Sequence, residues 1–254
     1  MSKKLLIVLA VVFILLQACT TQGVDLTGDS VPIQRTTKSS ALLAFNRDAY
    51  AFNKSIDNGV VKPLAKGYKQ VTPEFVDTGI SNAFSNLADV PNAVNALLQF
   101  KPKNAASDAG RFLINSSIGL AGFFDVATKM KLEKHHEDFG QTLAKWGMPS
   151  GEYIMLPVLG PSTARDSVGI VVDSITNPYF FFENSLAYYA LDKIDQRAAL
   201  LSSEGLLSEL SDNEYNSMRD VWLQKRKYLI NDGKLDTQAV KKKKSLIDEL
   251  EDLD

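Results

Sequence analysis

Apolar side chains recur at helical spacing along the first third of this 254-residue chain. Phe45, Ala49, Phe52 and Ile56 fall at i, i+4, i+7 and i+11, which places them in one stripe along a helix. A second helix is expected to begin at Thr72-Pro73-Glu74, with an N-cap, a proline in the first helical position and a first-turn acid. Its apolar face comprises Val76, Ile80, Ala83, Phe84 and Leu87. The pattern predicts two amphipathic helices.

Prolines, glycines and capping residues divide the later helical segments. Pro91 is expected to open one segment, and Pro102 another that Gly119 ends. Ser162 is the expected cap of a helix over residues 163–175, and an aromatic-rich helical segment follows from Pro178.

A last helix is predicted from a capping box. In Ser211-Asp212-Asn213-Glu214 the serine hydroxyl can accept from the amide three residues on, while Glu214 reaches back to the serine amide. We expect this helix to run to Gly233.

The middle of the chain, residues 119–162, has a different pattern. It is rich in glycine, with prolines and aromatic residues between, which predicts loops and irregular structure. A short strand is expected at Tyr153 to Leu156, and long alternating strands are absent. The chain is therefore expected to be mainly α, with a glycine-rich irregular middle.

The first residues have the form of an export signal. Lys3 and Lys4 precede an apolar run from Leu5 to Leu16, which is shorter than the roughly 20 residues that a membrane-spanning helix needs. Leu16-Gln17-Ala18-Cys19 resembles a bacterial lipobox, in which the Cys19 thiolate takes a lipid. The alternative is an ordinary signal peptide with a chance cysteine.

Composition divides the chain into four predicted parts and argues against a nucleic-acid-binding function. The predicted parts are a lipoprotein signal peptide at 1–18, a lipidated flexible tether at 19–40, a helical domain at 41–233, and a charged, disordered tail at 234–254. A net charge of −2 without a broad basic region argues against nucleic-acid binding. One cysteine permits no disulfide within the chain.

The common catalytic and metal-binding motifs are absent from the sequence. The chain has no Gly-x-Ser-x-Gly elbow, no His-Glu-x-x-His and no phosphate-binding glycine-rich loop. His135 and His136 stand beside Glu137 and Asp138, but adjacent residues of a helix point apart, so a polar surface turn is favoured over a metal site. We expect no metal, no cofactor and no enzymatic activity, although a triad dispersed in sequence stays open.

Aromatic residues are concentrated in the segment from Pro178 to Asp192. A helix lying in the headgroup region would use such rings, because a tyrosine has one apolar end and one that hydrogen-bonds with water. Packing in a protein core is the alternative, and the residues leave both open. The same two interpretations apply to Phe123 and Phe124.

Several motifs resemble the MlaA family, also called VacJ, of outer-membrane lipoproteins. The similarity begins at "FNRDAYAFNKSID", returns at "RFLINSSIGLAGFFDVA" and is most specific in "EDFGQTLAKWGMPSGEYIMLPVLGPSTARD". It extends from Phe45 to Leu207 and includes the lipobox. Met148-Pro149-Ser150 departs from the glycine-rich version that is usual in the family.

The resemblance implies a fold and a function. The family forms a helical ring in the inner leaflet of the outer membrane, lipid-anchored and facing the periplasm, and the ring encloses an amphipathic channel. It removes phospholipids from the outer leaflet and passes them to a soluble periplasmic carrier (MlaC-like), in some bacteria beside a trimeric porin. Its members are not enzymes. An envelope scaffold that moves no lipid and a lipid hydrolase are the alternative functions.

Candidate site residues follow from these motifs. Candidates for loop and channel contacts are Phe123, Phe124, Phe139, Gly140, Trp146, Gly147, Gly151 and Tyr153. The glycines, with Gly160, either permit a mobile loop or allow tight turns. Arg111, Arg165 and Asp166 are candidates for headgroup contacts or for structural ion pairs.

Overall fold

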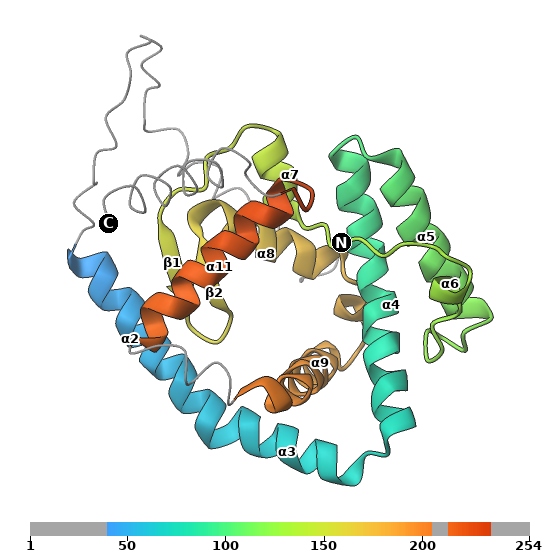
Figure 1. Ribbon diagram of the computed structural model, residues 1–254, viewed down its shortest axis with the longest axis horizontal. Coiled ribbons are helices and arrows are strands. Elements are labelled where there is room, and N and C mark those ends of the chain that lie inside the picture. The colour runs from blue at the N-terminus through green and yellow to red at the C-terminus, as the bar shows by residue number, and fades with distance from the viewer. Residues whose placement is uncertain (1–39, 205–212, 235–254) are drawn as a thin grey trace, which may run out of the picture. The chain divides into compact units, whose positions relative to one another are not determined.

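The computed structural model describes residues 40–204 and 213–234 (Figure 1). The chain divides after Ser203 into two compact units, and each is described by itself. The predicted signal peptide, Cys19, the tether up to residue 39, Ser211-Asp212 and the tail from residue 235 lie outside the described residues. The division into a single domain at 41–233 with flanking segments stays a prediction.

The first unit begins with one long helical run. Helix α2 (Ser40–Ile56) passes through a π-helical turn η1 (Asp57–Val61) into α3 (Lys62–Val71) (Figure 1). Pro63 explains the π-helical turn. Proline has no N–H to donate to the carbonyl four residues earlier, and its ring clashes with that carbonyl, so the helix widens there. The predicted first helix is confirmed.

Helix α4 (Glu74–Leu98) contains 25 residues and is the longest helix described in this unit. It begins one residue after the predicted proline position, with Pro73 as N-cap. The expectation that Pro91 opens a new segment is wrong, because α4 continues through it. An interior proline costs about 3 kcal/mol, and hydrogen bonds made by Asn86, Asn92 and Asn95 on both sides offset that cost.

Helix α5 (Pro102–Ser117) folds back along α4 and starts at the predicted proline. The middle of the chain then holds two short helices, α6 (Val126–Lys129) and α7 (Phe139–Lys145). Strand β1 (Tyr153–Leu156) has the predicted bounds and pairs antiparallel with β2 (Gly160–Thr163), with Leu156 opposite Gly160.

The remainder of this unit is helical. The N-cap of α8 (Ala164–Thr176) is Thr163, whose hydroxyl accepts from the Asp166 amide, so the Ser162 cap was predicted one residue too early. The aromatic segment is split into a 3-10 turn η2 (Pro178–Phe181) and α9 (Ser185–Ala199), and a second turn η3 (Leu201–Ser203) follows.

Helix α4 is central to this arrangement. It contacts α5, α7, α8 and α9, while α3 packs against α9 and α2 against β1 (Figure 1). Helix α11 (Glu214–Ile230) belongs to the second unit, and Asn213 is its N-cap. The chain is mainly helical, as predicted. Within residues 40–204 and 213–234, no helix has both the length and the hydrophobicity needed to cross a membrane.

Candidate functional site

Polar side chains predominate among the buried residues that the structure describes. Eighteen polar or charged residues are buried, against eleven apolar ones, and seven of those eleven are alanines. Large apolar side chains are instead exposed on every helix from α2 to α5. Asp, Asn and Arg are rarely buried fully unless they are paired. The unit is therefore held together by polar contacts in its interior and presents apolar side chains outside.

One face of α4 supplies much of this polar interior. We call it the polar stripe of α4: Asn82, Asn86, Asp89, Asn92, Asn95 and Gln99. The members follow one another at intervals of three and four residues, so they run along the helix as a continuous, slowly turning band. Asp89 is fully buried, and Asn86 and Asn95 are 2% exposed.

The first half of the stripe holds the loop that follows α5. Asn82 Nδ2 donates to the Phe123 carbonyl at 3.1 Å, and Asn86 Nδ2 donates to Ser116 Oγ at 2.8 Å. Gly122 lies against Asn86, and a Cβ built there would come within 2.7 Å of its Cβ atom. With a φ of +88° as well, this position requires glycine. The loop is thus fixed against α4.

A buried ion network lies in the middle of the stripe. Asp89 accepts from Lys134 Nζ, and its second oxygen lies 3.5 Å from Arg111 Nε. Arg111 Nη2 donates to Asp125 Oδ2 at 3.0 Å, and Nη1 donates to the Leu132 carbonyl. The network joins α4, α5 and the loop on both sides of α6.

The two carboxylates that flank Arg111 have opposite pKa shifts. Burial raises the pKa of Asp89 in spite of the nearby Lys134 and Arg111. Burial also acts to raise the pKa of Asp125, but hydrogen bonds from Thr128, Arg111 and Asn115 outweigh it and hold that pKa well below its ordinary value. Asp125 is therefore firmly ionised, and its charge balances Arg111.

The second half of the stripe holds α7 and α8. Asn95 donates to Asp173 Oδ1 at 2.9 Å and accepts from Thr142 Oγ1 at 2.9 Å, while Gln99 donates to Thr142. Asp173 also accepts from the Phe139 amide, at the start of α7. These bonds fix α7 and α8 on α4 without a large apolar core.

Two asparagines of α2 bind the backbone of the β-hairpin. Asn46 donates to the Tyr153 carbonyl at 2.9 Å and accepts from the Met155 amide at 2.7 Å. Asn53 donates to the Leu156 carbonyl at 2.9 Å and accepts from the Val158 amide at 2.7 Å. Seven helical residues advance about 10.5 Å and three strand residues about 10 Å, so both carboxamides meet β1 in register. Each acts as a peptide group of a neighbouring strand would.

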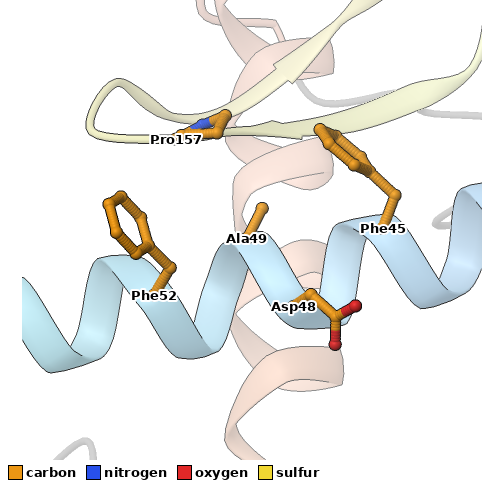
Figure 2. Close-up of a pocket in the computed structure, with 5 residues that line it drawn as sticks. All are labelled: Phe45, Asp48, Ala49, Phe52 and Pro157. Atoms are coloured by element: carbon orange, nitrogen blue, oxygen red, sulfur yellow. The ribbon is translucent and has the colours of Figure 1, made fainter.

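An apolar groove lies beside this hairpin (Figure 2). We call it the α2 groove; its lining residues are Phe45, Asp48, Ala49, Phe52 and Pro157, and its volume is about 330 Å³. Figure 2 shows both phenyl rings directed toward the hairpin, on either side of Ala49. Ala49 is buried, whereas Phe45 and Phe52 are 45% and 50% exposed. The groove is thus open along one side.

Three turns carry an exposed apolar residue in left-handed backbone. Phe100 follows α4, Leu120 follows α5 and Val158 lies in the hairpin turn, with φ of 60°, 53° and 67°. A bulky residue at positive φ is unusual, since glycine or asparagine adopts it at lower cost. Phe100 is 89% exposed. These three positions thus combine an unfavourable backbone conformation with an exposed apolar side chain.

The predicted loop and channel residues do not form one cluster. The Phe123 ring lies against Gly79 near the start of α4, and the Phe124 ring packs edge-on against the Phe123 ring. Trp146 Nε1 donates to the Leu98 carbonyl at the other end of α4. The 19 residues between Gly79 and Leu98 correspond to about 28 Å of helix, so these aromatic residues are well separated.

The other candidates have local structural surroundings. Phe139 packs edge-on against Trp146, and Gly140 lies where α7 approaches Gly169 of α8 closely. Gly147 and Gly151 have positive φ in the turns before β1. Tyr153 is buried, and Asn46 binds its carbonyl.

The charged candidates are buried in ion pairs. Arg111 is 2% exposed and belongs to the network of Asp89 and Asp125. Arg165 Nε donates to Asp166 Oδ1 at 3.0 Å at the start of α8, and Arg165 and Asp166 are 6% and 5% exposed. This geometry supports the ion-pair alternative for all three.

The histidine pair contributes to the packing of the loop before α7. The His135 amide and Nδ1 both lie within hydrogen-bond distance of Asp108 Oδ1, and the His136 carbonyl accepts from Gln141. Among the described residues, no three His, Cys, Asp or Glu side chains form a group that could hold a metal ion.

Sequence reasoning missed the polar stripe of α4 and the hairpin contacts of Asn46 and Asn53. The signal for the stripe was present, since amides and acids recur every three or four residues between Asn82 and Gln99. An amphipathic pattern does not show which face is buried, and in a water-soluble protein the apolar face is the buried one. Asn46 and Asn53 carried a weaker signal, a spacing of two helical turns.

Comparisons with known proteins agree with one another. The family model for the MlaA lipoprotein matches residues 40–229. The intermembrane phospholipid transport system lipoprotein MlaA of Shigella flexneri is 32% identical over 247 residues, which are 94% of this chain and 94% of that protein. The protein of the same name from Haemophilus influenzae is 33% identical, over 85% of this chain and 88% of that one.

A solved structure is similar as well. It concerns the structural basis for maintenance of bacterial outer membrane lipid asymmetry, and one of its chains superimposes with a TM-score of 0.67 at 32% sequence identity. The match covers 74% of this chain and 98% of that chain.

Proposed function

Because this chain belongs to the MlaA lipoprotein family, we propose that it is an outer-membrane lipoprotein that removes phospholipids from the outer leaflet and passes them toward the periplasm. This retrograde transport maintains the lipid asymmetry of the outer membrane. The protein acts without catalysis, and the direction of net flow comes from its partners, because a passive route shifts no equilibrium.

The distribution of buried residues is the observation that supports this proposal. Polar groups bind one another inside the first unit, and bulky apolar side chains lie outside. In hydrocarbon, backbone and polar side chains must find partners within the protein, because no water is present to bind them. The exposed apolar turns at Phe100, Leu120 and Val158 fit the same surroundings. This is the burial expected of a helical domain that lies in one leaflet.

The anchor and the compartment are part of the proposal. Cys19 takes the lipid, and the tether that follows ends where α2 begins, at Ser40. Two or more acyl chains hold a protein firmly on a membrane, whereas one holds it marginally. We place the domain in the inner leaflet of the outer membrane, facing the periplasm.

The proposed partners follow from the transport step. A phospholipid that leaves the membrane needs a soluble periplasmic carrier, MlaC-like, because its chains are insoluble in water. A trimeric porin beside the lipoprotein is a further proposed partner.

We also propose roles for the candidate residues. Two separate surfaces are the proposed contacts for the phospholipid. One is the loop after α5, with Phe123 and Phe124, and the other is the region from α7 to the start of β1, with Phe139, Gly140, Trp146, Gly147, Gly151 and Tyr153. Arg111, Arg165 and Asp166 act as structural ion pairs that keep these surfaces in shape.

The test is the phospholipid content of the outer leaflet in a strain that lacks this protein. We expect accumulation that the wild-type gene reverses and that Cys19→Ala reverses poorly. No accumulation, in a strain with no second copy, would contradict lipid transfer and favour the scaffold. Phospholipid breakdown by the pure protein, lost on substitution of one serine, would favour the hydrolase.

A further inference from the structure

We infer that the α2 groove binds one acyl chain of a phospholipid whose headgroup bears an amine, with Asp48 facing the ammonium group. The inference rests on the proposed function and extends it by naming a binding position and a headgroup class. It is carried by the lining of the groove, by the bonds that form it and by its charge.

The lining fits hydrocarbon. Phe45, Ala49, Phe52 and Pro157 present only carbon to the groove, and the two phenyl rings are half exposed (Figure 2). A volume of about 330 Å³ is near the lower end for ligand sites, which span roughly 300–1,000 Å³. That space suits part of one chain rather than a whole phospholipid.

The groove is formed by specific bonds. Its floor belongs to α2 and its far side to the hairpin, and Asn46 and Asn53 join the two through four hydrogen bonds to backbone. The two bonds of Asn53 hold the residues on either side of Pro157, and so help to place it opposite the rings. The separation between helix and hairpin is therefore set by polar contacts, and the apolar surface between them stays open.

The hairpin turn indicates hydrocarbon beside the groove. Its residues are Pro157, Val158 and Leu159. Turns in water favour Gly, Pro, Asn, Asp and Ser, so the two aliphatic residues after Pro157 are unusual there. Val158 is 66% exposed and Leu159 is 48% exposed. The groove therefore continues into an apolar edge.

Charge complementarity selects the headgroup. Asp48 is the only ionisable residue of the lining, and Figure 2 shows its carboxylate on the side of the rings away from Pro157. Arg47 and Lys54 each follow a ring by two residues, so they project about 200° further round the helix. A lipid whose chain enters beside the rings thus meets a carboxylate at its polar end. An ammonium group is attracted there, and an anionic headgroup without an amine is repelled.

The experiment uses the full-length lipidated protein in vesicles of phosphatidylethanolamine and phosphatidylglycerol in equal amounts. A photoreactive p-benzoylphenylalanine replaces Phe52, and mass spectrometry identifies the lipid that is crosslinked after illumination. The matched control carries the same group in place of Phe75, which is 70% exposed on α4. Phe45 is the second site, in case the first variant fails to fold.

At Phe52 we expect adducts enriched in phosphatidylethanolamine by about two- to fivefold, the range for one exposed ion pair. At Phe75 the adducts should follow the vesicle composition, and Asp48→Asn should return the Phe52 ratio to that value. Equal ratios at both positions would overturn the inference while leaving the proposed transport intact.

Two other outcomes would also overturn it. A crosslink to the peptide that contains Cys19 would mean that the protein's own acyl chains fill the groove. An absence of lipid adducts at every position would remove the membrane setting, so that the inference and the proposed function would fall together.

Discussion

Helices α4 and α2 use asparagine for different purposes. On α4, asparagines bind side chains and loops inside the unit, and the buried face is polar. On α2, two asparagines bind hairpin backbone, and the neighbouring face is apolar and half exposed. The difference indicates that polar contacts stabilise the fold, whereas the exposed apolar side chains contact the membrane in which we propose that the domain lies. Substitutions in the polar interior around α4 should therefore alter unfolding most, and substitutions on apolar turns should alter membrane binding most.

The largest effect on unfolding is expected for Arg111→Met. The variant keeps a long side chain but leaves Asp89 and Asp125 without their shared partner. Removing one member of a buried ion pair costs about 3–5 kcal/mol. Denaturant unfolding in non-ionic detergent measures it, with Arg47→Met, an exposed arginine on α2, as the control that should stay within about 0.5 kcal/mol. Equal midpoints for the two variants would show that the interior network does not stabilise the fold.

A smaller loss is expected for Asn53→Leu. The leucine removes both hydrogen bonds to the hairpin, so the Leu156 carbonyl and the Val158 amide lose Asn53 as a partner, at a cost of about 1–3 kcal/mol. Asn58→Leu, an exposed position on η1, is the matched control. Hydrogen exchange at the Val158 amide gives a local readout. If protection of this amide were unchanged in Asn53→Leu, the pairing of β1 with β2 would be enough to hold the hairpin turn, without the bonds to α2.

Acidification tests the buried carboxylates, whose contributions to the free energy of unfolding change with pH in opposite directions and partly cancel. The lowered pKa of Asp125 gives stability above the ordinary carboxyl pKa of about 3.9, and this is lost as the pH falls. Burial raises the pKa of Asp89 and of Asp108, so their contributions are present at low pH and are lost as the pH rises through the raised values. Unfolding measured between about pH 2 and 6 should show a loss on acidification that Asp125→Asn flattens. The same slope in both proteins would contradict the assignment of that loss to Asp125.

Much of the fold could be predicted from local patterns. The helices around Phe45 and Pro102, and the strand from Tyr153 to Leu156, follow from periodicity and from proline. The continuation of α4 through Pro91 could not be predicted, because bonds to distant residues offset its cost.

The site was harder to predict, because its contacts join residues far apart in sequence. Asn95 and Asp173 are 78 positions apart, and nothing local indicates that they meet. Whether Arg111 contacts a headgroup or an ion pair was open for the same reason, since Asp89 comes from another helix. Polar residues on a helix are also ordinarily assigned to the water-exposed face. On the polar stripe of α4 that assignment reverses, and the reversal is visible only when the partners are in place.

The smallest effect on unfolding, with a clear effect on binding, is expected for Phe100→Gly. Glycine relieves the cost of left-handed backbone, about 1–2 kcal/mol, and loses a similar amount through the freer unfolded chain, so stability should change by less than about 1 kcal/mol. Because the ring is almost fully exposed, its removal takes away apolar area that hydrocarbon would cover, about 1.5–3 kcal/mol for a whole side chain. Vesicle flotation should therefore show weaker binding of a Cys19→Ala protein that also carries Phe100→Gly, with Cys19→Ala alone as the reference. If the two proteins bound equally while their unfolding matched, the turns would not lie in hydrocarbon, and the contrast between the two helices would need another cause.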